Sequence, residues 1–417
     1  MVRVFKNIDD RWKTILLVAA AFVLVRALLL AAVYNISGGT EFTYDVRVHF
    51  HLAGAPFEPF SGTRYWAGQY PPLQGMLEAI LLAPLRYLVG DFLAIRTSFI
   101  IWEAFSVFLT WLCMERMNVP ARLSRLILLL LVIMPSGWMT SAVMAQEEVM
   151  AGAFVAGAML LWARDRSLLA IALCGLGVGA GKIFLVLPLF AMVLASVAGG
   201  GGIRPVIAGA LTSALPYTPM LLASFFKGES VPLIGFTPTF EFTSGIWNLG
   251  SSLSNISSVT AKRISLILGL LGAMAPLMWF FLRGALRGIS VRRLSLTLLV
   301  MLLWFLNLFY HVNPEYFAIV LPLMAVALRD TRTIVLGYMA LSLPWAVNFF
   351  YGVSIAMSRG ALGGQGGFVN LFGALFPGRP GGYLTAALIV TVIANLTLVI
   401  HLTTMLFNYR ENDSGLS

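Results

Sequence analysis

The sequence predicts an all-α polytopic membrane protein. We expect one integral membrane domain over residues 1–417, with about twelve membrane-spanning helices and juxtamembrane helices at its outer face. The composition is 59% hydrophobic and only 11% charged, whereas a soluble domain has about 25% charged residues. The mean hydropathy is +0.87. The apolar runs are too long and continuous for the strands of a membrane barrel, so the spans should be helices.

The first span is expected at residues 14–34. The segment before it contains four cations, Arg3, Lys6, Arg11 and Lys13. By the positive-inside rule, these cations place the N-terminus in the cytoplasm. The run is long for the apolar part of a signal peptide and no A-x-A cleavage pattern follows it, so we expect the span to be retained. Residues 35–91 then form the first extracytoplasmic loop.

The charged residues between the later apolar runs assign each connecting loop to one side of the membrane. Residues 74–89 are interpreted as a re-entrant or interfacial helix, because a full span there would place the Glu115-Arg116 cluster outside. Further spans are expected at residues 92–114, 124–143, 149–163, 168–181, 183–198, 204–225, 264–282, 294–310, 316–328, 333–350 and 383–406. Residues 227–263 and 352–382 would be extracytoplasmic loops, and both termini cytoplasmic. The net charge of +10 then reflects basic cytoplasmic loops rather than nucleic-acid binding.

The first outer loop contains the most polar stretch of the first half of the chain. Asp45 lies about ten residues past the first span. A carboxylate half-sheltered at a membrane face can accept a proton from a hydroxyl, although a loop or helix-capping Asp is the alternative. Further along, Gln69-Tyr70-Pro71-Pro72 opens a helix whose N-terminus would suit a phosphate, or simply starts a helix.

Three later motifs also place ionisable groups on the predicted outer side. Lys182 follows a glycine-rich apolar run and is either a snorkelling lysine or a phosphate partner. Gln146-Glu147-Glu148 could bind a sugar or a cation, or cap the next helix. The segment HVNPEY, from His311 to Tyr316, offers a phosphate-contacting or a structural histidine. His49 and His51 could join Asp45 around a metal, but no second ligand cluster is visible, so no metal site is predicted.

In order, these motifs resemble those of the multispanning C-type (GT-C) glycosyltransferases that use a polyprenyl-phosphate sugar. The nearest branch is that of the polyprenol-phosphate-mannose-dependent α-mannosyltransferases. The matching positions are Asp45, the YPPL helix start at residues 70–73, the AQEE segment at 145–148, the glycine-rich span ending in Lys182, and His311, Tyr316 and Pro322. The family's Gly and Asn are not kept in AQEE. The match covers about residues 14–330.

The resemblance implies an inverting glycosyltransferase. It would move a sugar, in the first instance mannose, from a polyprenyl-phosphate donor to a hydroxyl of a glycolipid or glycan. Asp45 would be the general base, and Lys182, His311 and Arg64 would neutralise the donor phosphate. The residues expected to line the sugar and acceptor sites are Tyr44, Tyr65, Trp66, Gln69, Tyr70, Gln146, Glu147, Glu148 and Tyr316.

The expected setting is a bacterial inner or plasma membrane with the active site on the extracytoplasmic face. Membrane lipid surrounds the protein, and no nucleic acid partner is expected. No cofactor is called for beyond the lipid-linked donor, and a divalent metal is not indicated. The alternatives are a transporter or flippase for a lipid-linked sugar, which would explain the spans and outer acids, and a lipid-linked polymer ligase, which need not have a base.

Overall fold

The computed structural model describes residues 2–37, 72–180, 182–218, 222, 258–309, 313–358 and 380–409, and this part of the chain is helical throughout, with no strands. The elements are α1 (Val2–Ser37), α3 (Pro72–Val89), α4 (Asp91–Arg116), α5 (Ala121–Ile133), α6 (Pro135–Trp138), η2 (Met139–Val143), α7 (Glu148–Trp162), α8 (Ser167–Ala180), η3 (Ile183–Leu185), α9 (Val186–Ser196), η4 (Val197–Gly201), α10 (Arg204–Ala214), η5 (Leu215–Tyr217), α13 (Ser258–Leu282), α14 (Val291–Leu308), η6 (Pro314–Val320), α15 (Leu321–Ala327), α16 (Thr331–Ser358) and α18 (Pro380–Phe407).

Six helices in the described residues are long and apolar enough to cross a membrane: Lys13–Asn35, Asp91–Arg116, Ile183–Gly201, Arg263–Leu282, Val291–Leu308 and Thr385–Phe407. A seventh candidate is the pair Ala121–Ile133 and Pro135–Val143, if its 49° bend lies within one span. This confirms the prediction of an all-helical chain with apolar spanning helices, as expected for an integral membrane protein. It does not confirm the count of twelve or the outer-face helices.

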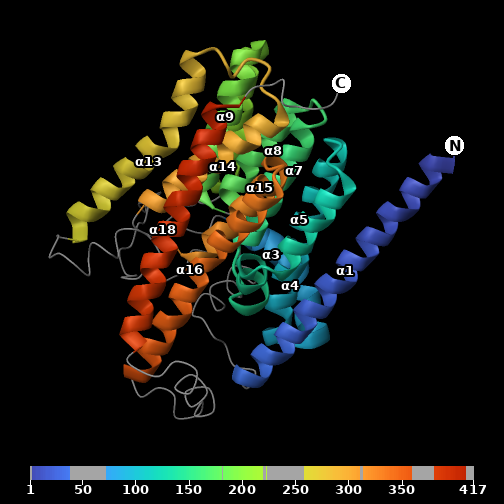
Figure 1. The fold of residues 1–417 in the computed structure, drawn as a ribbon, viewed down its shortest axis with the longest axis vertical. Coiled ribbons are helices and arrows are strands. Elements are labelled where there is room, and N and C mark those ends of the chain that lie inside the picture. Colours follow the sequence, from blue (N-terminus) through green and yellow to red (C-terminus); the bar gives the residue numbers. More distant parts are fainter. Residues whose placement is uncertain are drawn as a thin grey trace.

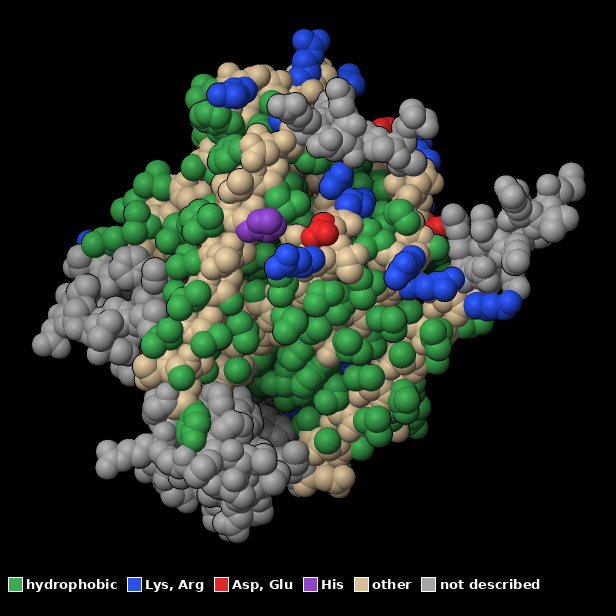
Figure 2. Space-filling view, viewed as in Figure 1, with side chains coloured by type: hydrophobic (Ala, Val, Ile, Leu, Met, Phe, Trp, Pro, Cys, Tyr) green, Lys and Arg blue, Asp and Glu red, His purple; other side chains and the backbone are tan. Residues whose placement is uncertain are grey.

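The long helices pack side by side into one bundle, with α1 and α13 at opposite edges (Figure 1). Hydrophobic side chains form a broad band over the lower and middle parts of the face seen in Figure 2. On α1, Val18 and Phe22 are buried while Leu17 and Leu24 are exposed. This pattern suits a helix that presents one stripe to the bundle and the other to lipid.

One end of the bundle is rich in arginine, and its arginines cap the last carbonyls of helices. Arg116 at the end of α4 donates to the carbonyl of Ala163 beyond α7, at 3.1 Å. Arg292 at the start of α14 donates to Ala327 at the end of α15, also at 3.1 Å. We call this the arginine-rich end.

Helix α8 contains the glycine-rich run and packs closely against α7 and α10. A Cβ atom on Gly175 would collide with Thr212, and one on Gly179 would collide with Pro216. The glycines therefore let neighbouring backbones approach, as small residues do between membrane helices.

Candidate functional site

The segment between α5 and α7 is irregular, and it organises both polar clusters described below. Pro135 begins α6 after a bend, a stretch of π-helix follows over η2, and Ala145 has a φ of 54°. π-Helical turns and left-handed non-glycine residues are uncommon and cluster at functional sites. The irregular backbone turns Ser141 toward α4 and sets Glu147 and Glu148 at the start of α7.

Lys182 meets both of these acids. Its Nζ atom lies 2.5 Å from Oε1 of Glu147 and 3.0 Å from Oε1 of Glu148. Both glutamates are fully buried, while the lysine side chain is 18% exposed. Lys182 has an extended backbone, with φ −141° and ψ 138°, between the end of α8 and η3. This break in the helix lets a residue that follows α8 reach the start of α7.

An aromatic wall closes the other side of the ammonium. Nζ of Lys182 lies 5.2 Å from the centroid of the Tyr316 ring, within the range of a cation–π contact. Tyr316 packs edge-on against Phe184, with ring centroids 5.0 Å apart. Tyr316 belongs to η6, a 3₁₀ run of seven residues, which is longer than such runs usually are. We refer to Glu147, Glu148, Lys182 and Tyr316 as the Lys182 cluster.

The Lys182 cluster has more acid than base. With all three groups ionised, two carboxylates share one ammonium and the sum of their charges is −1. Burying an uncompensated charge is costly, so such a group retains a partner or a proton. Carboxylate oxygens accept hydrogen bonds only, and therefore suit the hydroxyl groups of a sugar. An added phosphate would be repelled unless a carboxylate released the lysine.

A second polar cluster links α1 to α4. Nε of Arg26 donates to Oε2 of Glu103 at 2.9 Å, and Nη2 of Arg26 pairs with Oε1. Nη1 of Arg26 donates to the carbonyl of Val132 at 2.7 Å, and Ser141 donates to Oε2 of Glu103 at 2.6 Å. Both charged side chains are almost completely buried. We call this the Arg26–Glu103 pair.

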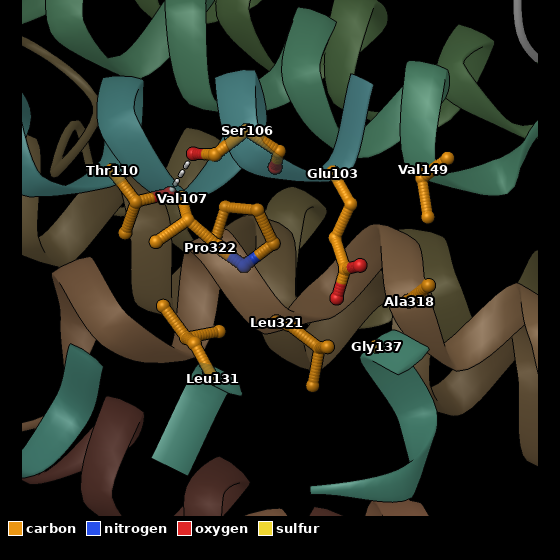
Figure 3. Close-up of a pocket in the computed structure, with 10 residues that line it drawn as sticks. All are labelled: Glu103, Ser106, Val107, Thr110, Leu131, Gly137, Val149, Ala318, Leu321 and Pro322. Carbon is orange, nitrogen blue, oxygen red and sulfur yellow. Dashed lines mark hydrogen bonds between the residues drawn. The ribbon is translucent and has the colours of Figure 1, made fainter. Parts of the chain in front are cut away.

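A cavity of about 20 Å³ lies beside Glu103, which is room for roughly one water molecule. Glu103 extends its carboxylate toward it from α4, and Thr110 donates to the carbonyl of Ser106 at 2.7 Å along the same wall (Figure 3). The lining residues are Glu103, Ser106, Val107, Thr110, Leu131, Gly137, Val149, Ala318, Leu321 and Pro322. Val149 directly follows Glu148, so the cavity adjoins the chain segment of the Lys182 cluster.

The two clusters lie at a similar depth. Arg116 bonds to Ala163, so α4 and α7 end together at the arginine-rich end. Glu103 and Glu148 precede those ends by 13 and 15 residues, or about 20 Å at 1.5 Å per residue. Ionisable groups inside a bundle of apolar helices are uncommon, which makes both clusters candidates for a functional site.

The structure brings together four of the predicted site residues: Lys182, Glu147, Glu148 and Tyr316. Gln146, which precedes Glu147 in the sequence, is also buried, and its Nε2 donates to the Met144 carbonyl at 3.4 Å. Eight predicted residues lie outside the described residues: Asp45, Arg64, His311, Tyr44, Tyr65, Trp66, Gln69 and Tyr70. The same holds for His49 and His51. The expected meeting of Asp45, Lys182 and His311 therefore stays a prediction.

The sequence interpretation missed the Arg26–Glu103 pair. Arg26 interrupts the first apolar run and Glu103 interrupts the run at residues 92–114. Two opposite charges inside apolar segments would have been a signal, since such groups rarely occur in spans without a partner. It also missed the bond from Gln74 to Glu78 on α3, at 2.9 Å, where both side chains are buried.

Fold and site together define an all-helical membrane-type protein with a buried polar layer at one depth of its bundle. Among the described residues, no group of three or more His, Cys, Asp or Glu side chains is placed to hold a metal ion. Comparisons of the chain with protein-family models and with curated proteins find no match.

Proposed function

We propose that the protein is an inverting glycosyltransferase of the membrane. In this proposal it transfers a sugar, with mannose as the first candidate, from a polyprenyl-phosphate donor to a hydroxyl of a glycolipid or glycan. The proposed bundle has about twelve spans with outer-face helices. The active site faces the extracytoplasmic side of a bacterial inner or plasma membrane, opposite the arginine-rich end.

The observation that supports the proposal most is the Lys182 cluster. Three separate segments of the resemblance, AQEE, the lysine after the glycine-rich span, and Tyr316, supply residues in mutual contact. If the motifs matched the family only by chance, there would be no reason for their residues to lie in contact. The helix breaks at Ala145, Lys182 and η6 also fit a substrate site, because irregular backbone at membrane depth is tolerated where it lines a cavity or is buried in protein.

The chemistry proposed is a single displacement. The acceptor oxygen attacks the anomeric carbon, and its proton passes to the carboxylate of Asp45. The bond between the anomeric carbon and the phosphate oxygen breaks, and polyprenyl phosphate leaves with inversion at the sugar. The negative charge that grows on the phosphate is neutralised by His311 and Arg64, the kind of electrostatic assistance that is worth several kcal/mol.

The ion pairs with Glu147 and Glu148 restrict the role that Lys182 can have in donor binding. Because two carboxylates hold its ammonium, Lys182 can serve the phosphate only after one of them releases it. The acids themselves suit sugar or acceptor hydroxyls. If the cluster binds hydroxyls, Glu148→Gln should weaken sugar or acceptor binding. If Lys182 is the phosphate ligand, Glu148→Gln should leave donor binding intact or tighten it, while Lys182→Ala weakens it.

The deciding experiment uses the full chain purified in detergent. It is given polyprenyl-phosphate-mannose with and without membrane lipid extract from the host, and products are followed by mass spectrometry. The proposal expects acceptor-dependent release of polyprenyl phosphate and a heavier glycosylated acceptor. Asp45→Asn should abolish turnover while the donor still binds, whereas Glu41→Gln, an acid of the same segment, should remain active. Full activity of Asp45→Asn would reject Asp45 as the base.

A transporter for a lipid-linked sugar is the second candidate, and one observation favours it. Discontinuous helices that meet around ionisable groups are typical of transporter binding sites. Sealed vesicles containing the protein and a labelled donor separate the two functions. Movement of the donor between leaflets without bond cleavage supports transport, and cleavage that requires an acceptor supports transfer. A polymer ligase would instead consume a lipid-linked polymer, and its Asp45→Asn variant would remain active.

A further inference from the structure

Two arginines approach the ring of Tyr409 at the arginine-rich end, and a third arginine lies near one of them. The guanidinium carbon of Arg292 lies 5.4 Å from the centroid of the Tyr409 ring, and that of Arg293 lies 5.8 Å from it. Arg293 also stacks on Phe280 at 4.6 Å. Arg329 follows α15 and binds the carbonyls of Val326 and Leu328, on either side of the Ala327 carbonyl that Arg292 binds. The residues come from α14, from the turn before α16 and from the end of α18.

Backbone carbonyls hold Arg292 and Arg329 in place. Nη1 of Arg329 donates to the carbonyls of Val326 at 2.9 Å and Leu328 at 2.8 Å, and Nε of Arg292 donates to Ala327. Within the described ranges, neither Arg292 nor Arg329 forms an ion pair with a carboxylate. The carbonyl bonds leave the Nη groups of Arg292 and the Nε and Nη2 groups of Arg329 for another acceptor.

The concentrated positive charge has an energetic consequence. Burial, and then the repulsion of Arg292, lower the pKa of Arg329 to about 10. Basic residues that only obey the positive-inside rule can spread over the surface, as the exposed Arg287 does. Holding the Arg292 and Arg329 guanidinium groups close together is unfavourable, and an anion bound between them would relieve their repulsion. Guanidinium forks match the oxygen geometry of phosphate and can bind it through two parallel hydrogen bonds.

We propose that Arg292 and Arg329, with Arg293 and Tyr409 beside them, form a binding site for a phosphate group. That group is carried by the headgroup of an anionic lipid or by a free phosphate anion. Basic pockets between membrane helices commonly bind phosphate headgroups. The site is separate from the Lys182 cluster, about 20 Å away along the helices, and does not depend on the glycosyltransferase proposal.

The test measures binding of phosphatidylglycerol to the full chain in neutral detergent by native mass spectrometry. The double variant Arg292→Gln/Arg329→Gln is compared with Arg287→Gln, a matched loss of one exposed arginine before α14. The wild type should retain one tightly bound phosphatidylglycerol. The double variant should bind it about thirty-fold more weakly, on the basis of two lost cations, while Arg287→Gln should bind as the wild type does.

Added inorganic phosphate distinguishes the two sources of the ligand. If it displaces the bound lipid, the site accepts free phosphate anions; if not, the site is specific for the lipid headgroup. Equal affinity in the wild type and the double variant would overturn the proposal, as would an equal loss in Arg287→Gln. If the double variant does not fold, the single variants Arg292→Gln and Arg329→Gln provide the same comparison, each with a smaller expected loss.

Discussion

Arg26 on α1 and Glu103 on α4 form a two-point ion pair at a depth where both side chains are almost completely buried. The pair joins the first helix to the rest of the bundle. A carbonyl and a serine hydroxyl satisfy further atoms of the two groups. Replacing one partner would leave the other as an uncompensated buried charge, which is more costly than the pair itself is favourable.

Glu103→Leu should therefore lower the free energy of unfolding by about 3–5 kcal/mol, measured as a fall in the unfolding temperature in detergent. Arg26→Met should cost a similar amount. The double variant, which removes both charges and keeps apolar volume, should recover most of the loss.

A matched control is Arg86→Ala. It breaks the ion pair between Arg86 and Asp91, whose side chains are 45% and 57% exposed, respectively. Exposed pairs contribute about 0–1 kcal/mol, so this variant should unfold close to the wild-type temperature. Equal losses in Arg86→Ala and Arg26→Met would contradict the importance of burial.

Gly137→Ala should destabilise the same region without changing any charge. A Cβ atom at position 137 would lie 2.6 Å from Oε1 of Glu103 and 3.2 Å from the carbonyl of Leu131. Overpacking of this kind typically costs about 1–3 kcal/mol. Gly152→Ala is the control, because its Cβ would meet its nearest neighbours at 3.4 Å. The unfolding temperatures of the two variants are compared directly. A larger decrease for Gly152→Ala than for Gly137→Ala would contradict the prediction.

The ion pairs of the Lys182 cluster predict which of two variants loses more free energy of unfolding. Lys182→Met removes the ammonium and leaves two buried carboxylates facing one another, which should cost about 3–5 kcal/mol. Glu148→Gln removes one negative charge and preserves the pair with Glu147 at 2.5 Å, so its loss should be smaller. Chemical unfolding curves measure both, and the reverse order would show that the acids do not depend on this lysine.

Asp330 should make stability depend on pH at the start of α16. Its Oδ2 accepts from the backbone N and from Oγ1 of Thr333, both at 2.7 Å. These bonds hold the pKa of Asp330 below its ordinary value. The unfolded chain binds this proton more readily, so the stabilisation is complete above the ordinary carboxyl pKa of about 3.9 and is lost as pH falls through the lower folded value.

Asp330→Ala should therefore cost about 1 kcal/mol near neutral pH. Its unfolding temperature should approach that of the wild type as the pH falls below the lowered pKa of folded Asp330. Asp330→Asn still offers an acceptor that does not titrate, so its own unfolding temperature should change less with pH over this range. A wild-type curve that is flat down to low pH would argue against the cap.

The helical fold class could be predicted from sequence because apolar composition and run length act locally. The expected spans 294–310 and 383–406 agree with α14 and α18 within a few residues. Bends were harder to predict. The break between α5 and α7 depends on Pro135, on π-helical hydrogen bonding and on packing against α4, and only the proline is visible in the sequence.

Part of the candidate site was predictable for a similar reason. Lys182 and the two glutamates stand out as charges at the edges of apolar runs, and the structure places them in contact. Their pairing with one another was not foreseen, because sequence order does not reveal which ends meet. Arg26 and Glu103 are 77 positions apart, and only the folded bundle brings them together.

In helix α8, the absence of a side chain helps to position the Lys182 cluster. Gly179 leaves no room for even a methyl group beside Pro216, and Lys182 follows three positions later. Any larger residue at position 179 would push α8 and η5 apart and carry the ammonium away from its two acids. Random mutagenesis of this helix should therefore yield variants that lose the ion pairs of Lys182 although every polar residue is intact.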